Sequence, residues 1–319
     1  MRPHEDDRGL IRGRRLRWVP LVAVAVVIAA TTAVMVVAKA RQANPDTVDC
    51  TRAKCVALTF DDGPTPFTDR LLRILRDNNA RATFFLIGNK VARDPASARR
   101  IADAGMEIGG HTWEHPNMTT IPQADIPSQL SKATQAIAAA TGRAPTLYRP
   151  AGGLSDDAVR AEAGRQGLAE ILWDVIPFDW INDANIPATR YMLMTQIKPG
   201  SVVLLHDTYS STVDLVYQFL PVLKANGYHL VTGSHLLGAR TPGGSYGGRE
   251  NGPPANELVD VPATRIPTLP ATPLAEAGTQ PADHRHSQPK PGRPTIVSQH
   301  GPLLMHAGPT HAEKRRYPT

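Results

Sequence analysis

The sequence predicts an α/β protein: a distorted or incomplete (β/α) barrel of about seven strand–helix units. Short apolar runs such as CVALTF and SVVLLH alternate with amphipathic stretches such as FTDRLLRILRDN between residues 53 and 237, as in parallel strands joined by helices. Helical stretches end at Gly105, Gly142, Gly167 and Gly227, which is typical of a left-handed helix cap. Repeated units of this number in fewer than 200 residues favour a barrel over an open sheet.

One transmembrane helix is expected before this region, at residues 18–38, where the chain reads WVPLVAVAVVIAATTAVMVVA without a charge. As a helix it would span roughly 30 Å, enough to cross a bilayer. Residues 1–17 carry six arginines and three acids, so the positive-inside rule predicts a cytoplasmic N-terminus. A cleavable signal peptide is the alternative, although its apolar region would be shorter. We expect a single-pass protein of the cell membrane with its folded domain outside the cytoplasm, or a secreted protein if the segment is cleaved.

Residues 39–53 are expected to form a linker that leads into the folded domain at residues 54–238. Cys50 and Cys55 stand at this junction with four residues between them. An oxidising compartment would allow a small disulfide loop, while a free thiol pair or simple packing are the alternatives. Neither cysteine is expected to take part in catalysis.

Residues 239–319 are predicted to be a disordered, Pro-rich tail, because 14 of the chain's 29 prolines lie in residues 240–319. The formal net charge of +6 comes from the two ends, since residues 18–239 carry twenty basic and twenty acidic side chains. The folded part therefore has no net basic field to attract nucleic acid. The sequence contains no Gly-x-Gly-x-x-Gly loop that would indicate a nucleotide-binding site.

Unusual polar residues follow the predicted strands, at the face where a barrel gathers its catalytic groups. The first strand leads into TFDDGP, which contains Asp61 and Asp62 and on its own would be read as a turn. The third leads into HTWEHP, which contains His111 and His115. Two imidazoles four residues apart can bind one ion together with an aspartate, leaving positions open for water or a carbonyl oxygen.

Three more groups follow later strands. These are YRPAGG with Arg149, the pair Asp179-Trp180, and LLHD with His206. Each alone has an ordinary explanation as an ion-pair partner, a core aromatic residue or a satisfied histidine. Together, in this order and each after a separate strand, they indicate one site.

In this order the motifs resemble the five blocks of the polysaccharide deacetylase family, also called the NodB-homology or carbohydrate esterase 4 family, over about residues 55–237. TFDDG, HTWEH and LLH are full matches. The resemblance implies that Asp62, His111 and His115 hold one divalent metal ion. Zinc suits two histidines and one aspartate, and so do cobalt, nickel and iron.

The resemblance also implies a role for each remaining polar group. Asp61 would be the general base, oriented by Arg149. His206 would be the general acid, tuned by Asp179.

The chemistry of amide hydrolysis suits these residue types. An amide carbonyl is a poor electrophile, so a Lewis acid must polarise it and activate a water that Asp61 deprotonates. A backbone N–H near Gly152 would stabilise the oxyanion, and His206 would protonate the departing amine. Gly152 and Trp180 are therefore expected to contact the substrate.

The third and fourth blocks depart from the family pattern. Ala151 and Gly152 stand where Pro and Tyr are usual, so a substrate-facing ring is missing, and Ile176 replaces an Asp. These changes bear on substrate preference more than on the type of reaction, since the ligands and proton-transfer residues are retained.

The expected function is removal of N-acetyl groups from an extracytoplasmic polysaccharide. N-acetylglucosamine of peptidoglycan is the first substrate expected, and chitin-like oligomers are the next. The alternatives are an O-acetyl esterase acting on xylan-like glycans and a non-catalytic cell-wall-binding protein on the same scaffold.

Overall fold

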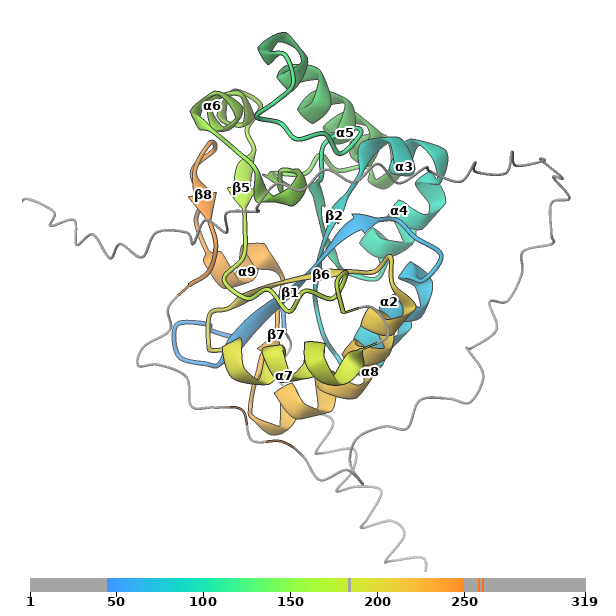
Figure 1. Ribbon diagram of the computed structural model, residues 1–319, viewed down its shortest axis with the longest axis vertical. Helices are drawn as coiled ribbons and strands as arrows, with labels where there is room; N and C mark the ends of the chain where they lie inside the picture. Colours follow the sequence, from blue (N-terminus) through green and yellow to red (C-terminus); the bar gives the residue numbers. More distant parts are fainter. Residues whose placement is uncertain (1–44, 183–184, 250–257, 259, 261–319) are drawn as a thin grey trace, which may run out of the picture. The chain divides into compact units, whose positions relative to one another are not determined.

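The computed structural model describes residues 45–182 and 185–249, together with residues 258 and 260 (Figure 1). The predicted cytoplasmic segment 1–17 and the predicted span 18–38 lie outside this part of the chain. Among the residues that are described, no helix has both the length and the apolar composition needed to cross a membrane.

A sheet of eight strands forms the centre of the fold, in the order β6-β1-β2-β3-β4-β5-β8, with β7 paired to β1. All pairings between these strands are parallel, as the alternation of strands and helices predicts. The strands are β1 Cys55–Gly63, β2 Thr83–Leu86, β3 Glu107–Gly110, β4 Leu147–Tyr148, β5 Ala169–Ile171, β6 Val202–His206, β7 His229–Leu230 and β8 Ser245–Tyr246.

The sheet curves back on itself without closing into a regular barrel. The chain just after β5 returns to β6, where Val175 forms an isolated parallel bridge with Val203. Val175 N–H donates to the Val202 carbonyl at 3.2 Å, and Leu204 N–H donates to the Val175 carbonyl at 3.0 Å. The expectation of a distorted or incomplete parallel α/β barrel agrees with this arrangement.

The helices lie around the strands (Figure 1). Their apolar faces are buried against the sheet, as Leu71 and Leu75 of α2 and Leu220 and Leu223 of α8 illustrate. The helices are α2 Thr68–Asp77, α3 Gly88–Arg93, α4 Pro95–Asp103, α5 Ile126–Thr141, α6 Asp157–Arg165, α7 Ile186–Gln196, α8 Ser210–Ala225 and α9 Gly233–Leu237, with short 3₁₀ turns η1 Gln123–Asp125 and η2 Ala151–Gly153.

Four of these helices end in the way the sequence predicts. The glycines that follow α4, α5, α6 and α8 all have positive φ angles, of 75° at Gly105, 77° at Gly142, 76° at Gly167 and 77° at Gly227. Only glycine adopts this conformation without a steric cost from Cβ, so each residue stops its helix and turns the chain toward the next strand.

The folded part continues beyond the predicted boundary at residue 238. Residues 239–249 are described, and within them β8 pairs with β5. Ser245 Oγ donates to the buried carboxylate of Glu170 on β5 at 2.7 Å. The boundary expected from composition is therefore too early, because a short strand in a Gly- and Pro-rich segment gives little hydrophobic pattern.

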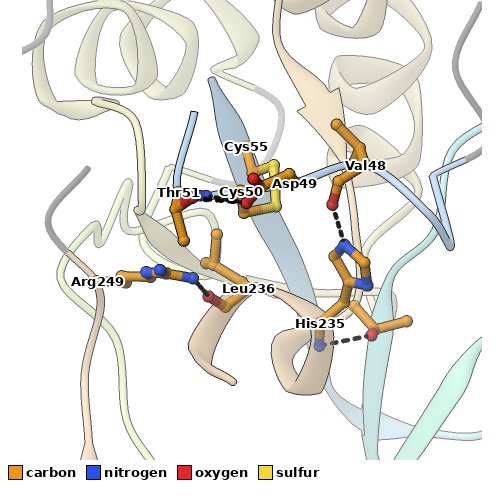
Figure 2. Close-up of a disulfide and its surroundings, with 9 residues drawn as sticks. Val48, Asp49, Cys50, Thr51, Cys55, His235, Leu236 and Arg249 are labelled. Atoms are coloured by element: carbon orange, nitrogen blue, oxygen red, sulfur yellow. Dashed lines mark hydrogen bonds between the residues drawn. A yellow bond between two sulfur atoms is a disulfide. The ribbon is translucent and has the colours of Figure 1, made fainter. Parts of the chain in front are cut away.

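The expected linker is partly ordered around the disulfide that joins Cys50 and Cys55 (Figure 2). Both cysteines are buried. The same segment is held at Val48, whose carbonyl accepts a hydrogen bond from His235 Nε2 of α9 at 2.6 Å. The disulfide thus ties the entry segment to the start of β1, and the Val48–His235 bond ties it to α9.

Reduction of this disulfide is expected to lower the free energy of unfolding by about 2 kcal/mol, from the chain entropy of a loop of this size. Urea unfolding of the protein with and without dithiothreitol measures the difference. The double variant Cys50→Ser/Cys55→Ser is the control, and its unfolding should not respond to the reductant. Equal stability of the oxidised and reduced unsubstituted protein would contradict the expectation.

Candidate active site

The parallel register brings four of the predicted motifs to one end of the sheet. Asp61 and Asp62 lie near the end of β1, and Asp61 is the register partner of His206, the last residue of β6. His111 follows β3 directly, and Arg149 follows β4. Neighbouring parallel strands end on the same side, so residues far apart in sequence become neighbours here.

The three predicted metal ligands form one cluster. Asp62 Oδ1 lies 3.4 Å from His111 Nε2 and 3.3 Å from His115 Nε2, and the three ligand atoms are all within 4.8 Å of one another. Asp62 Oδ1 is buried and has no hydrogen-bond partner among the described residues. A buried carboxylate oxygen without a partner is costly, so this donor set fits a divalent cation.

His111 is held in the form that a metal ligand requires. Its Nδ1 lies 2.7 Å from the backbone carbonyl oxygen of Arg149. A carbonyl can only accept, so Nδ1 carries the proton and the lone pair of Nε2 points toward Asp62. Asp62 Oδ1 and His111 Nε2 are therefore both available to bind one cation.

The electrostatics of the cluster also favour cation binding. Burial raises the pKa of Asp62, but the nearby imidazoles of His111, His115 and His206 outweigh it and hold that pKa well below its ordinary value. Burial, followed by the charge of His111, lowers the pKa of His115. An ionised carboxylate and a neutral imidazole are the forms that bind metal.

Asp61 does not share the surroundings of Asp62, because it is paired with Arg149. Arg149 Nη1 donates to Asp61 Oδ1 at 2.7 Å, and both side chains are almost completely buried. Asp61 Oδ2 lies 3.7 Å from His111 Nε2, at the edge of the ligand cluster. One oxygen of this carboxylate is thus held by the guanidinium, and the other faces the site.

The guanidinium of Arg149 is fixed on every side. It donates to Thr59 Oγ1 at 2.8 Å and to the carbonyls of Ile171 and Leu172 at 2.8 and 2.7 Å. It also lies 4.1 Å from the ring centroid of Phe85. These contacts compensate for its burial and fix the direction from which Asp61 is held.

His206 has its own carboxylate partner. Its Nδ1 lies 3.0 Å from Asp179 Oδ1, and its backbone N–H donates to Asp179 Oδ2 at 2.8 Å. Thr212 Oγ1 donates to the same Oδ2 at 2.9 Å. Burial lowers the pKa of His206, but the hydrogen bond and charge of Asp179 more than offset it, so the pKa is raised. The Nε2 of His206 has no hydrogen-bond partner among the described residues, so it is available for a proton transfer.

The predicted substrate contacts are placed less completely. The Trp180 ring meets the His206 ring edge-on, with centroids 5.1 Å apart. Gly152 lies in η2 after Arg149 with φ of 62°, and its part in oxyanion stabilisation stays a prediction. The Ile176 backbone N–H donates to Gln196 Oε1 of α7 at 3.3 Å.

Several supporting residues carry no signal in the sequence. Thr59 and Thr212 are ordinary strand and helix residues whose hydroxyls contact Arg149 and Asp179. Trp173 also contributes, because the Arg149 guanidinium lies 5.4 Å from its ring centroid. Their roles depend on contacts between distant segments, which local patterns do not reveal.

A family model described as polysaccharide deacetylase matches residues 48–171. The peptidoglycan-N-acetylglucosamine deacetylase of Bacillus cereus is 36% identical over 190 residues, which are 58% of this chain and 88% of that protein. The peptidoglycan-N-acetylmuramic acid deacetylase PdaC of Bacillus subtilis is 35% identical over 60% of this chain. The match covers 40% of PdaC, so this chain spans less than half the length of that relative.

Solved structures show the same likeness. The structure described as T48 deacetylase with substrate superposes with a TM-score of 0.59 at 36% identity, covering 63% of this chain and 100% of that one. A protein of Bacillus anthracis described as a CE4 family pseudoenzyme superposes with a TM-score of 0.56 at 31% identity, covering 61% of this chain and 69% of that one. This similarity, together with the five motifs in the order described above, identifies the chain as a member of the polysaccharide deacetylase family.

Proposed function

We propose that this chain hydrolyses N-acetyl groups of an acetylated polysaccharide, with N-acetylglucosamine of peptidoglycan as its first substrate. One observation supports this most directly. The cluster of Asp62, His111 and His115 lies at the same end of the sheet as two separate hydrogen-bonded pairs, Asp61 with Arg149 and His206 with Asp179. Hydrolysis of an amide needs a base for water and an acid for the leaving amine, and these two pairs supply them.

Asp62, His111 and His115 would hold a divalent cation, for which we propose zinc, and when bound it would polarise the amide carbonyl and lower the pKa of water. Asp61 accepts the proton of the attacking water through the oxygen that Arg149 leaves free. His206 gives a proton from Nε2 to the sugar nitrogen as the carbon–nitrogen bond breaks. The products are acetate and a free amine, and Asp179 stabilises the imidazolium before that transfer.

We propose an extracytoplasmic location, because the wall polymer that relatives are named for lies there. Two features support it. The Cys50–Cys55 disulfide suits an oxidising compartment, and the apolar segment 18–38 suits a single-pass anchor or a cleaved signal.

A non-catalytic wall-binding protein is the second candidate function. The likeness to a solved pseudoenzyme favours it, as do the departures at Ala151, Gly152 and Ile176. Its weakness is that binding alone requires neither a general base nor a general acid, and this chain keeps both Asp61 and His206 in hydrogen-bonded pairs.

The substitution Asp61→Asn is expected to lower kcat/KM for acetate release by roughly a thousandfold, because general-base catalysis contributes about 10²–10⁴. The assay measures acetate from peptidoglycan and N-acetylglucosamine oligomers with Zn²⁺ added, then with a chelator, which should also abolish release. Asp157→Asn is the matched control, since it makes the same change on a fully exposed side chain. Folded protein that binds Zn²⁺ but releases no acetate from any acetylated glycan would overturn the deacetylase proposal and support wall binding.

The pH dependence of kcat should reveal His206. Its raised pKa keeps the imidazolium present to higher pH, and the activity should fall as the pH rises through that pKa, because the general acid is then lost. Asp179→Asn removes the charge that raises this pKa and should move the alkaline limb to lower pH. An alkaline limb that stays in place in Asp179→Asn would show that His206 is not the acid, and Asp157→Asn should leave the whole profile unchanged.

A further inference from the structure

We propose that Gln129, on α5, is a positioning residue that holds the turn between His111 and His115 and thereby sets the affinity of the site for its cation. This inference rests on the metal-ligand role proposed above. It concerns a residue outside the five motifs named from the sequence, on a different element from all three proposed ligands.

The turn from His111 to His115 has a strained backbone. Thr112 and His115 both have φ of 61°, in the left-handed region that is unfavourable for residues other than glycine. For a β-branched residue such as Thr112 this conformation is a clear outlier. Such a turn persists only if its surroundings fix it, so the contacts that it makes decide where the His115 ring lies.

Gln129 makes three of these contacts with one side chain. Its Oε1 accepts from the backbone N–H groups of Trp113 and Glu114 at 3.1 and 3.0 Å. Its Nε2 donates to Glu114 Oε2 at 3.1 Å. Gln129 is 9% exposed, so water is a poor substitute for these bonds. A single amide thus holds both N–H groups at the middle of the turn.

The other side of the turn is held by α3. Gly88 N–H donates to the Thr112 carbonyl at 2.9 Å, and Asn89 N–H donates to the Trp113 carbonyl at 3.0 Å. A Cβ on Gly88 would lie 2.6 Å from Ala133 Cα of α5 and 2.7 Å from Trp113. The turn is therefore packed between α3 and α5, with Gln129 as its hydrogen-bond partner on the α5 side.

The two histidines depend on Gln129 to different degrees. His111 is fixed independently, by the end of β3 and by its bond to the Arg149 carbonyl. His115 is held through the turn, where its N–H donates to Thr112 Oγ1 at 3.0 Å, and its ring meets the His111 ring edge-on with centroids 4.8 Å apart. Its side chain is 39% exposed, and its Nε2 still lies 3.3 Å from Asp62 Oδ1. Loss of the Gln129 bonds should therefore move His115 away from the other two ligands.

Gln129→Met keeps the length of the side chain and removes all three bonds. We expect it to weaken Zn²⁺ binding by about 10- to 100-fold, the effect typical of residues that orient metal ligands. The measurement is the Kd of the purified metal-free protein for Zn²⁺, by competition with a chelating dye, with circular dichroism to show that the variant is folded. Gln135→Met is the matched control, because Gln135 is an exposed glutamine on the same helix.

A swap of the two partners tests the hydrogen bonds themselves. Gln129→Glu alone places a carboxylate beside Glu114 and should weaken Zn²⁺ binding. The double variant Gln129→Glu/Glu114→Gln exchanges donor and acceptor across the same contact and should restore the Kd, which a purely structural role of the helix would not predict. Unchanged Kd in Gln129→Met, or no recovery in the folded double variant, would overturn the inference. Failure of the unsubstituted protein to bind Zn²⁺ would instead overturn the metal site itself, and the inference with it.

Discussion

A guanidinium with no exposed surface stands at the centre of the candidate site, and the positions of the proposed base and of one proposed metal ligand both depend on it. The Arg149 side chain holds Asp61, while the Arg149 backbone carbonyl fixes the proton of His111 on Nδ1. One residue thus sets the orientation of a carboxylate and the tautomer of an imidazole. Removing a partner from a buried ion pair commonly costs 3–5 kcal/mol, since it leaves a charge without compensation. The site therefore tolerates little variation at this position.

The adjacent carboxylates of β1 have separate roles because their neighbours differ. Asp62, with φ of 70°, turns away from the strand toward two imidazoles, whereas Asp61 keeps the strand direction and meets Arg149. Asp179 is hydrogen-bonded through both of its carboxylate oxygens, to His206 and to Thr212. Each proposed proton-transfer group is thus paired with a fixed partner, whereas Asp62 keeps one buried oxygen without a hydrogen-bond partner among the described residues.

Much of this arrangement could be predicted from the sequence because it follows local rules. The alternation of strand and helix patterns predicted the parallel strands, and the glycines predicted the helix ends. The polar residues that follow the strands predicted where the candidate site lies. The short helix α3 has too few residues for a helical pattern, and β8 lies in a segment rich in Gly and Pro. Thr212 and Gln129 act through contacts across the fold. No pattern along the chain marks such partners, so the structure was needed to find them.

The pairing of β8 with β5 also matters for how this domain can be shortened. β5 lies between β4 and β8, and its Glu170 accepts hydrogen bonds from Tyr148 on one side and Ser245 on the other. A protein cut at residue 238, where the composition changes, would lose β8 and turn β5 into an exposed edge. Unpaired edges serve as templates for other strands. Shortened forms that end there should therefore self-associate, and those that retain residues 239–249 should remain dispersed.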